Sequence, residues 1–93
     1  MHGMFLNCHS LSSINLAGFI TKSNQYFDYM FSGCDSLKEV NLAAFNTENA
    51  ESLKGMFKGA SLLTSLDLYS FDTSLVGSME SMFNGCNSLK FLT

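Results

Sequence analysis

Large apolar residues recur along this chain in the spacing Leu-x-x-Leu-x-Leu, where x is mostly polar. The pattern occurs four times, the last time cut short, at Leu11, Ile14, Leu16; Leu37, Val40, Leu42; Leu63, Leu66, Leu68; and Leu89, Leu92. The last two members of each copy alternate about a polar residue, as a strand with one buried face requires. The pattern therefore predicts a short strand in each copy.

The copies follow one another at a constant spacing, and the same spacing links the Met-Phe pairs at 4–5, 30–31, 56–57 and 82–83. A period of about 20 to 50 residues indicates one supersecondary unit copied along an axis and stacked on its neighbours. We therefore predict a single repeat array, cut from a longer protein. Its parts are the end of one repeat (1–3), three complete repeats (4–29, 30–55 and 56–81) and a partial repeat (82–93).

The second half of each repeat has a different apolar period. Apolar residues at i, i+3, i+6 and i+7 are typical of one stripe of a short helix. They are Ala50, Leu53, Met56 and Phe57, then Val76, Met79, Met82 and Phe83. Asn46-Thr47 and Asp72-Thr73 offer side-chain oxygens that could cap the start of these helices. The column Asn7, Gly33, Gly59 and Gly85 predicts the left-handed residue that closes each one.

Strand, turn, helix and turn together make the unit of a solenoid. Strands of successive units are expected to pair in parallel, about 4.7 to 4.9 Å apart. The predicted fold class is an α/β solenoid of about 26 residues per repeat. Its inner face is a parallel β-sheet and its outer face is formed by short helices.

Three cysteines, Cys8, Cys34 and Cys86, occupy one column, in which Ala60 stands for the remaining copy. A position that accepts either Cys or Ala favours a small buried side chain. A bridge between Cys8 and Cys34 is the second interpretation and requires their side chains to converge. Cys34 and Cys86 are two layers apart, roughly 10 Å at strand spacing, which is too far for a disulfide. A metal site is the least favoured, because the spacing is not that of zinc ligands.

The composition of the chain narrows the range of possible functions. The chain is 46% hydrophobic, but it has no apolar stretch long enough to span a membrane and no visible secretory signal peptide. The net charge is −3 and all five cations are lysine, so we expect no nucleic-acid partner. His9 shares its column with polar turn residues, and no nucleophile stands in a setting typical of catalysis. We predict no catalytic residue, no cofactor and no metal.

The exposed face of the predicted sheet is the candidate binding surface. Asn15, Asn41 and Asp67 form one column on it, and a ladder of side-chain hydrogen bonds is favoured there over ligand contacts. Two aromatic residues interrupt this small, polar face: Tyr69 and, in the column of Glu39, Phe91. Exposed aromatic residues anchor interfaces, but at the open end of an array they can equally have lost the next repeat. The candidate partner-binding residues are Glu39, Asn41, Asp67, Tyr69 and Phe91.

The run Met-Phe-Ser-Gly-Cys-Asp-Ser-Leu-Lys-Glu-Val-Asn-Leu at 30–42 is echoed at 82–92. With Phe71-Asp72-Thr73, this run resembles the BspA-like leucine-rich repeat, and the resemblance spans the whole chain. Ala60, Leu62 and Asn7 depart from the pattern without altering the packing. The resemblance implies a leucine-rich-repeat array without shared catalytic residues. It also implies a cell-surface or secreted protein, of adhesin or lipoprotein type, that contacts host or neighbouring cells.

Two functions compete on this basis. The first is a non-catalytic interaction module of the cell-adhesion type, which binds a protein partner through the exposed sheet face. The partner implied by the resemblance is a surface protein of a host or neighbouring cell. The second is a purely structural spacer within a larger surface protein. An enzyme would need an acid/base cluster on one face, and only Glu39 and Asp67 come near that, so we predict that the chain is not an enzyme.

Overall fold

The computed structural model describes residues 2–16 and 18–92, and it describes Phe91 and Leu92 by their backbone alone. The two predicted ends of the array, at residues 1 and 93, lie outside the described residues. Four short strands are present: β1 (Ser13–Asn15), β2 (Glu39–Asn41), β3 (Ser65–Leu66) and β4 (Phe91–Leu92). They lie where the Leu-x-x-Leu-x-Leu spacing predicts strands.

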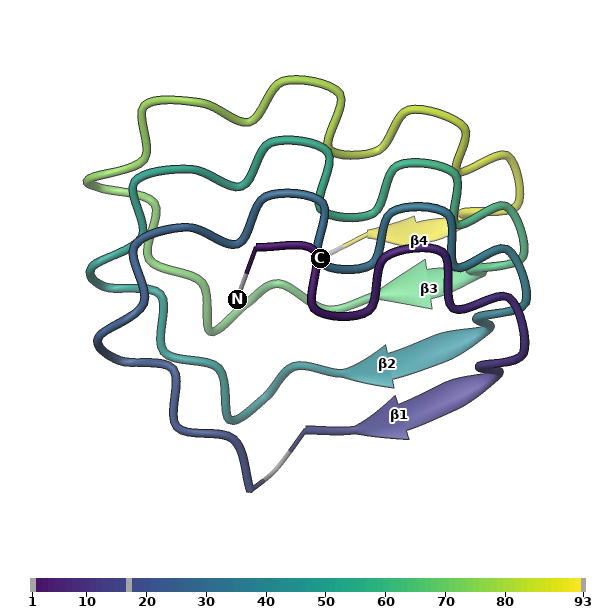
Figure 1. Ribbon diagram of the computed structural model, residues 1–93, viewed down its shortest axis with the longest axis horizontal. Helices are drawn as coiled ribbons and strands as arrows, with labels where there is room; N and C mark the ends of the chain where they lie inside the picture. Colours follow the sequence, from purple (N-terminus) through teal and green to yellow (C-terminus); the bar gives the residue numbers. More distant parts are fainter. Residues whose placement is uncertain (1, 17, 93) are drawn as a thin grey trace.

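The strands pair in parallel, as predicted. β1 pairs with β2, so that Asn15 lies opposite Asn41, and β3 pairs with β4, so that Leu66 lies opposite Leu92. Partners in both pairs differ by 26 in residue number. β2 and β3 lie next to each other but belong to separate two-stranded sheets (Figure 1). The described strands thus form two short parallel pairs rather than one continuous sheet.

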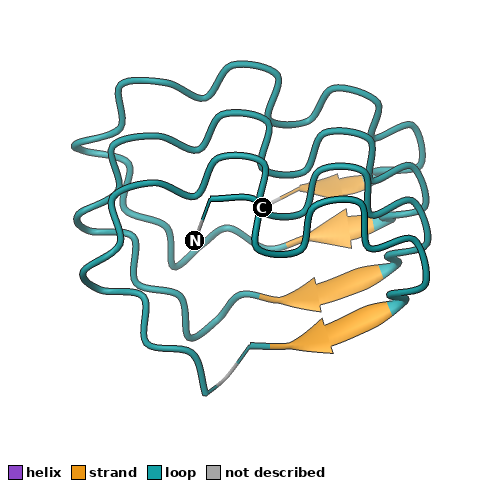
Figure 2. Ribbon diagram, in the orientation of Figure 1, coloured by secondary structure: helices purple, strands orange, loops and turns teal. Residues whose placement is uncertain are grey.

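No helix is present in residues 2–16 and 18–92, so the prediction of outer helices is wrong (Figure 2). The reason lies in the backbone hydrogen bonds. The N–H groups of Leu53, Gly55 and Phe57 each donate to a carbonyl within the segment 78–82, over 2.8 to 3.0 Å. Met56 and Lys58, which alternate with them, donate to the carbonyl three residues back, over 3.1 to 3.2 Å. In an α-helix, each of these N–H groups would donate to the carbonyl four residues back. Because they donate elsewhere, the segment forms consecutive turns instead.

Two columns of left-handed residues also exclude a helix. The first is the predicted one, with φ between 58° and 80° at Asn7, Gly33, Gly59 and Gly85. The second, with φ between 57° and 60°, was missed: Gly3, Tyr29, Gly55 and Ser81. Its tyrosine and serine carry no sequence signal for this conformation. Each turn segment thus contains two left-handed residues four positions apart, which a right-handed helix does not tolerate in its interior.

The core is built around a column of phenylalanine rings. Successive rings are nearly parallel, within 9°, and their centroids are 5.4, 5.4 and 6.2 Å apart; the rings belong to Phe5, Phe31, Phe57 and Phe83. Phe31 and Phe57 are fully buried, together with Met56. Met79, predicted on the same apolar stripe as Phe83, is exposed. Each fully buried ring contributes about 1.5 to 3 kcal/mol through its removal from water.

Two buried threonines join neighbouring segments. The hydroxyl of Thr47 donates to the carbonyl of Asp72 over 3.0 Å and accepts the N–H of the same residue over 2.8 Å. Thr21 forms the same pair of bonds with Asn46, over 3.0 and 2.9 Å. The prediction that Thr47 helps to cap a helix is therefore wrong. Both hydroxyls satisfy backbone groups of a segment distant in sequence, which would otherwise be left unpaired.

Candidate interaction surface

The candidate surface, named here the sheet face, consists of the exposed residues on and just after β1, β2 and β3. Alternation along the extended chain produces it. In β2, Glu39 and Asn41 are exposed on either side of the half-buried Val40. After β3, Asp67 and Tyr69 are exposed on either side of a half-buried leucine. The sheet face therefore presents side chains whose positions are set by a buried neighbour on each segment.

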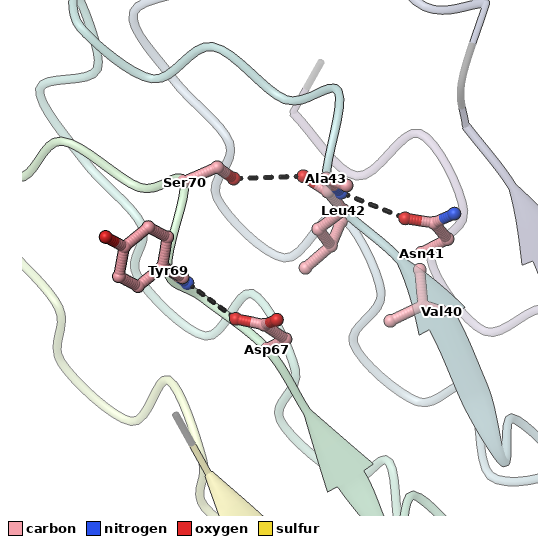
Figure 3. Close-up of a pocket in the computed structure, with 7 residues that line it drawn as sticks. All are labelled: Val40, Asn41, Leu42, Ala43, Asp67, Tyr69 and Ser70. Carbon is pink, nitrogen blue, oxygen red and sulfur yellow. Dashed lines mark hydrogen bonds between the residues drawn. The ribbon is translucent and has the colours of Figure 1, made fainter.

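Two adjacent hollows mark the sheet face. The first has a volume of about 220 Å³ and is lined by Val40, Asn41, Leu42, Ala43, Asp67, Tyr69 and Ser70 (Figure 3). The second has a volume of about 550 Å³ and is lined by Ser13, Ile14, Asn15, Glu39, Val40, Asn41, Ser65 and Asp67. They share Val40, Asn41 and Asp67. The two hollows are thus parts of one surface.

Asn41 and Asp67 hold the backbone that follows each strand. Asn41 Oδ1 accepts the N–H of Ala43 over 3.0 Å, and Asp67 Oδ1 accepts the N–H of Tyr69 over 2.9 Å (Figure 3). A side-chain oxygen that bonds its own backbone two residues on is typical of an Asx turn. These two oxygens therefore serve local turns rather than the predicted ladder along the sheet.

Tyr69 is an exposed aromatic side chain on a fixed backbone. Its ring is open to solvent, with 88% of the residue exposed. The bond from Asp67 holds its N–H, and the next residue, Ser70, donates its hydroxyl to the carbonyl of Leu42 over 3.1 Å. These two bonds restrain the turn that carries Tyr69, which reduces the entropy that is lost when such a residue is used in binding. Tyr69 thus has the properties of an interface anchor.

The acidic residues of the sheet face have no basic partner within the described part of the chain. Contacts between charged groups connect neighbouring segments at 3.0 to 3.8 Å where a hydrogen bond joins His9 to Asp35 and ion pairs join Lys22 to Glu48 and Lys54 to Glu80. Among the described residues, Glu39 and Asp67 form no ion pair within 4 Å, and the same holds for Asp28, Glu51 and Asp72. No lysine lines either hollow. The sheet face therefore carries two unneutralised carboxylates.

The structure brings most of the predicted site residues together. Asn41, Asp67 and Tyr69 surround the first hollow, and Glu39 joins two of them around the second. Phe91 lies on β4 opposite Ser65, and only its backbone is described. Sequence reasoning missed Ser70, which connects the segment after β3 to the end of β2. No signal could have revealed it, because Gly18 and Ala44 occupy the same column.

The cysteines, the other residues considered for chemistry, serve to pack and bond the fold. The cysteines are free thiols, and Cys34 and Cys86 donate to the carbonyls of Phe5 and Phe57 over 3.0 and 3.1 Å. Burial raises the pKa of both thiols, which lowers their reactivity. Within residues 2–16 and 18–92, no three His, Cys, Asp or Glu side chains gather closely enough to bind a metal ion. The same residues contain no helix with the length and apolarity needed to cross a membrane.

These features define a small domain of short parallel strands, with tightly bonded turns and an acidic exposed face. The chain belongs to the DUF285 family, described as "Mycoplasma protein of unknown function"; the family model matches residues 1–91. The identification with BspA-like leucine-rich repeats is therefore wrong, because a different family accounts for nearly the whole chain. Location at the cell surface and an adhesion-type partner were implied by that resemblance alone and lose its support. Searches of curated proteins and of solved structures gave no match.

Proposed function

We propose that the chain is a non-catalytic binding module that holds a protein partner against its sheet face. The observation that carries the proposal is Tyr69, an exposed aromatic residue whose N–H is bonded to Asp67 and whose neighbour Ser70 is bonded through its hydroxyl to Leu42. Aromatic residues of this kind dominate the binding energy of protein interfaces. The hollow beside it gives a partner side chain a place to enter.

The scaffold of this module is proposed to be a solenoid of 26-residue repeats. The equal offset of both strand pairs and the column of stacked phenylalanine rings support this architecture. Inserting a second copy of residues 30–55 after residue 55 should then give a folded protein with a higher melting temperature, because one more interface between units is formed. A melting temperature below that of the original chain, measured by circular dichroism, would exclude the solenoid.

Binding can be tested without knowing the natural partner. A library of random peptides displayed on phage is selected against the immobilised chain, and the affinity of each enriched peptide is measured by isothermal titration calorimetry. For an interface anchor, Tyr69→Ala should weaken the selected peptides by at least about tenfold. Tyr26→Ala is the matched control, because Tyr26 is also exposed but lines neither hollow.

The stability of Tyr69→Ala should stay within about 0.5 kcal/mol of the original chain, because a residue that is 88% exposed contributes little. Ala43 occupies the position of Tyr69 in the preceding segment with the same backbone bond, so alanine fits there. If Tyr69→Ala binds every selected peptide as well as the original chain does, the sheet face is not the binding surface.

A structural spacer is the second candidate. It is favoured by the bonds that tie segments to each other, above all those of Thr21 and Thr47. A spacer needs stiffness and no recognition surface. Under this alternative the phage selection enriches no peptide whose binding depends on Tyr69, and only changes in the core alter the protein's behaviour.

A further inference from the structure

The chain contains an internal comparison that points to the chemistry of the partner. Residues 41–43 read Asn-Leu-Ala and residues 67–69, at the equivalent positions of the next copy, read Asp-Leu-Tyr. The first residue of each accepts the N–H of the third, over 3.0 and 2.9 Å. The turn is therefore the same in both segments. Only the later segment adds a negative charge and an aromatic ring, and neither is needed to make the turn.

We propose that Asp67 and Tyr69 form a subsite for an arginine side chain of an extended protein segment. The proposal rests on the binding function of the sheet face and specifies the class of partner. A planar guanidinium stacks on an aromatic ring and also pairs with a carboxylate, which an ammonium does less well. Asp67 uses Oδ1 for the turn, and its second carboxylate oxygen gives the guanidinium an acceptor.

The placement of the two residues suits this ligand. Asp67 and Tyr69 line the same hollow, and the bond between the Tyr69 N–H and Asp67 Oδ1 holds them together at the turn after β3. A guanidinium bound at this turn has both a carboxylate and an aromatic ring as neighbours, and the hollow of about 220 Å³ leaves room for its aliphatic stem.

Charge complementarity extends beyond this subsite. Glu39 lines the adjacent hollow with Asp67, and neither carboxylate has a described ion-pair partner. By the sequence spacing of 26 residues, Glu39 is equivalent to Ser65, two positions before Asp67. A second basic side chain two residues along an extended partner lies within reach of it. None of residues 1–93 is an arginine, so the arginine comes from outside this segment.

The test uses one defined probe, the peptide acetyl-Arg-Ser-Arg-Ser-Arg-amide, titrated into the isotopically labelled chain and followed by NMR. Amide shifts are expected at residues 39–41 and 67–70. Asp67→Asn and Tyr69→Ala should each raise the Kd about two- to fivefold, and the double variant about four- to twenty-fivefold. Asn41 and Ala43 already occupy the equivalent positions with the turn intact, so these variants preserve the fold.

The matched control for charge is Glu51→Gln, which changes the net charge by the same amount as Asp67→Asn but lies outside both hollows. It should leave the Kd within a factor of two. Equal loss of affinity in Glu51→Gln and Asp67→Asn would show unspecific attraction and overturn the proposal. An unchanged Kd in the double variant would overturn it too.

The failure of this inference can be told apart from failure of the proposed function. If phage-selected peptides need Tyr69 but contain no basic residue, and the arginine peptide does not bind, the sheet face is a binding surface for a different class of partner. If no selected peptide needs Tyr69, the binding function itself is wrong.

Discussion

Two regions of the molecule pair their segments with the same offset of 26 residues: the consecutive turns, called here the turn half, and the sheet face. They serve opposite purposes. In the turn half, around residues 53–59, alternate amides bond to the next segment and the rings of Phe31 and Phe57 stack in the dry interior. On the sheet face, the strands are two or three residues long and only alternate side chains are exposed to solvent. The comparison teaches that cohesion is concentrated in the turns, which leaves these exposed side chains available for recognition.

The largest expected effect comes from removing a ring in the turn half. Phe57→Ala should lower the free energy of unfolding by about 3 to 5 kcal/mol, because it leaves a cavity between two stacked neighbours. This is a large part of the total stability of about 5 to 15 kcal/mol expected for a domain of this kind. Urea denaturation followed by circular dichroism measures it.

The control for this change is Tyr69→Ala, which removes an aromatic ring of similar size from the sheet face. Its effect should stay within about 0.5 kcal/mol. If both variants lost the same free energy of unfolding, cohesion would not be concentrated in the turn half and the contrast between the two regions would be wrong.

A smaller effect is expected from the bonds between segments. Thr47→Val keeps the shape of the side chain but removes the hydroxyl that satisfies both the N–H and the carbonyl of Asp72. The expected loss is about 1 to 3 kcal/mol, because two hydrogen bonds are lost and each contributes about 0.5 to 1.5 kcal/mol. Thr73→Val serves as the control, because Thr73 occupies the same column but is exposed. Equal melting temperatures for the two variants would contradict a role of Thr47 in joining segments.

The smallest expected effect is a dependence of the free energy of unfolding on pH. The hydroxyl and then the N–H of Ser74 donate to Asp72 and lower the pKa of its carboxyl from the ordinary value of 3.8. Because the pKa is lower in the folded chain, the stabilisation is complete above pH 3.8 and is lost as the pH falls through the folded pKa. Asp72 is fully exposed, so the change in stability should be slight.

An NMR titration of the Asp72 carboxyl carbon checks this prediction. Ser74→Ala should move the titration midpoint of Asp72 upward, while a change at Ser23, a serine distant in sequence, should leave it unchanged. A midpoint that is the same with and without the Ser74 hydroxyl would show that this bond does not form in solution.

The strand positions and the candidate surface could be predicted from local pattern. Alternation about Val40 and Leu68 is enough to expose Asn41 and Tyr69, and the structure places both on the sheet face. The hollows could not be predicted, because they depend on how the chain leaves β2 and β3. The bond from Ser70 to the carbonyl of Leu42 joins two segments far apart in sequence, and no local pattern signals it.

The sequence by itself determined which residues of β1, β2 and β3 are buried or half-buried, the constant offset between strand partners and the left-handed column of Gly33, Gly59 and Gly85. These follow from hydrophobicity and from steric limits on single residues. Only the tertiary structure decided that the turn half is not helical. The spacing of Leu53, Met56 and Phe57 fits a helix locally, but carbonyls of the segment 78–82 accept amides that a helix would use. Local and distant carbonyls compete for the same N–H, and the distant ones accept it only after the two segments have packed against each other.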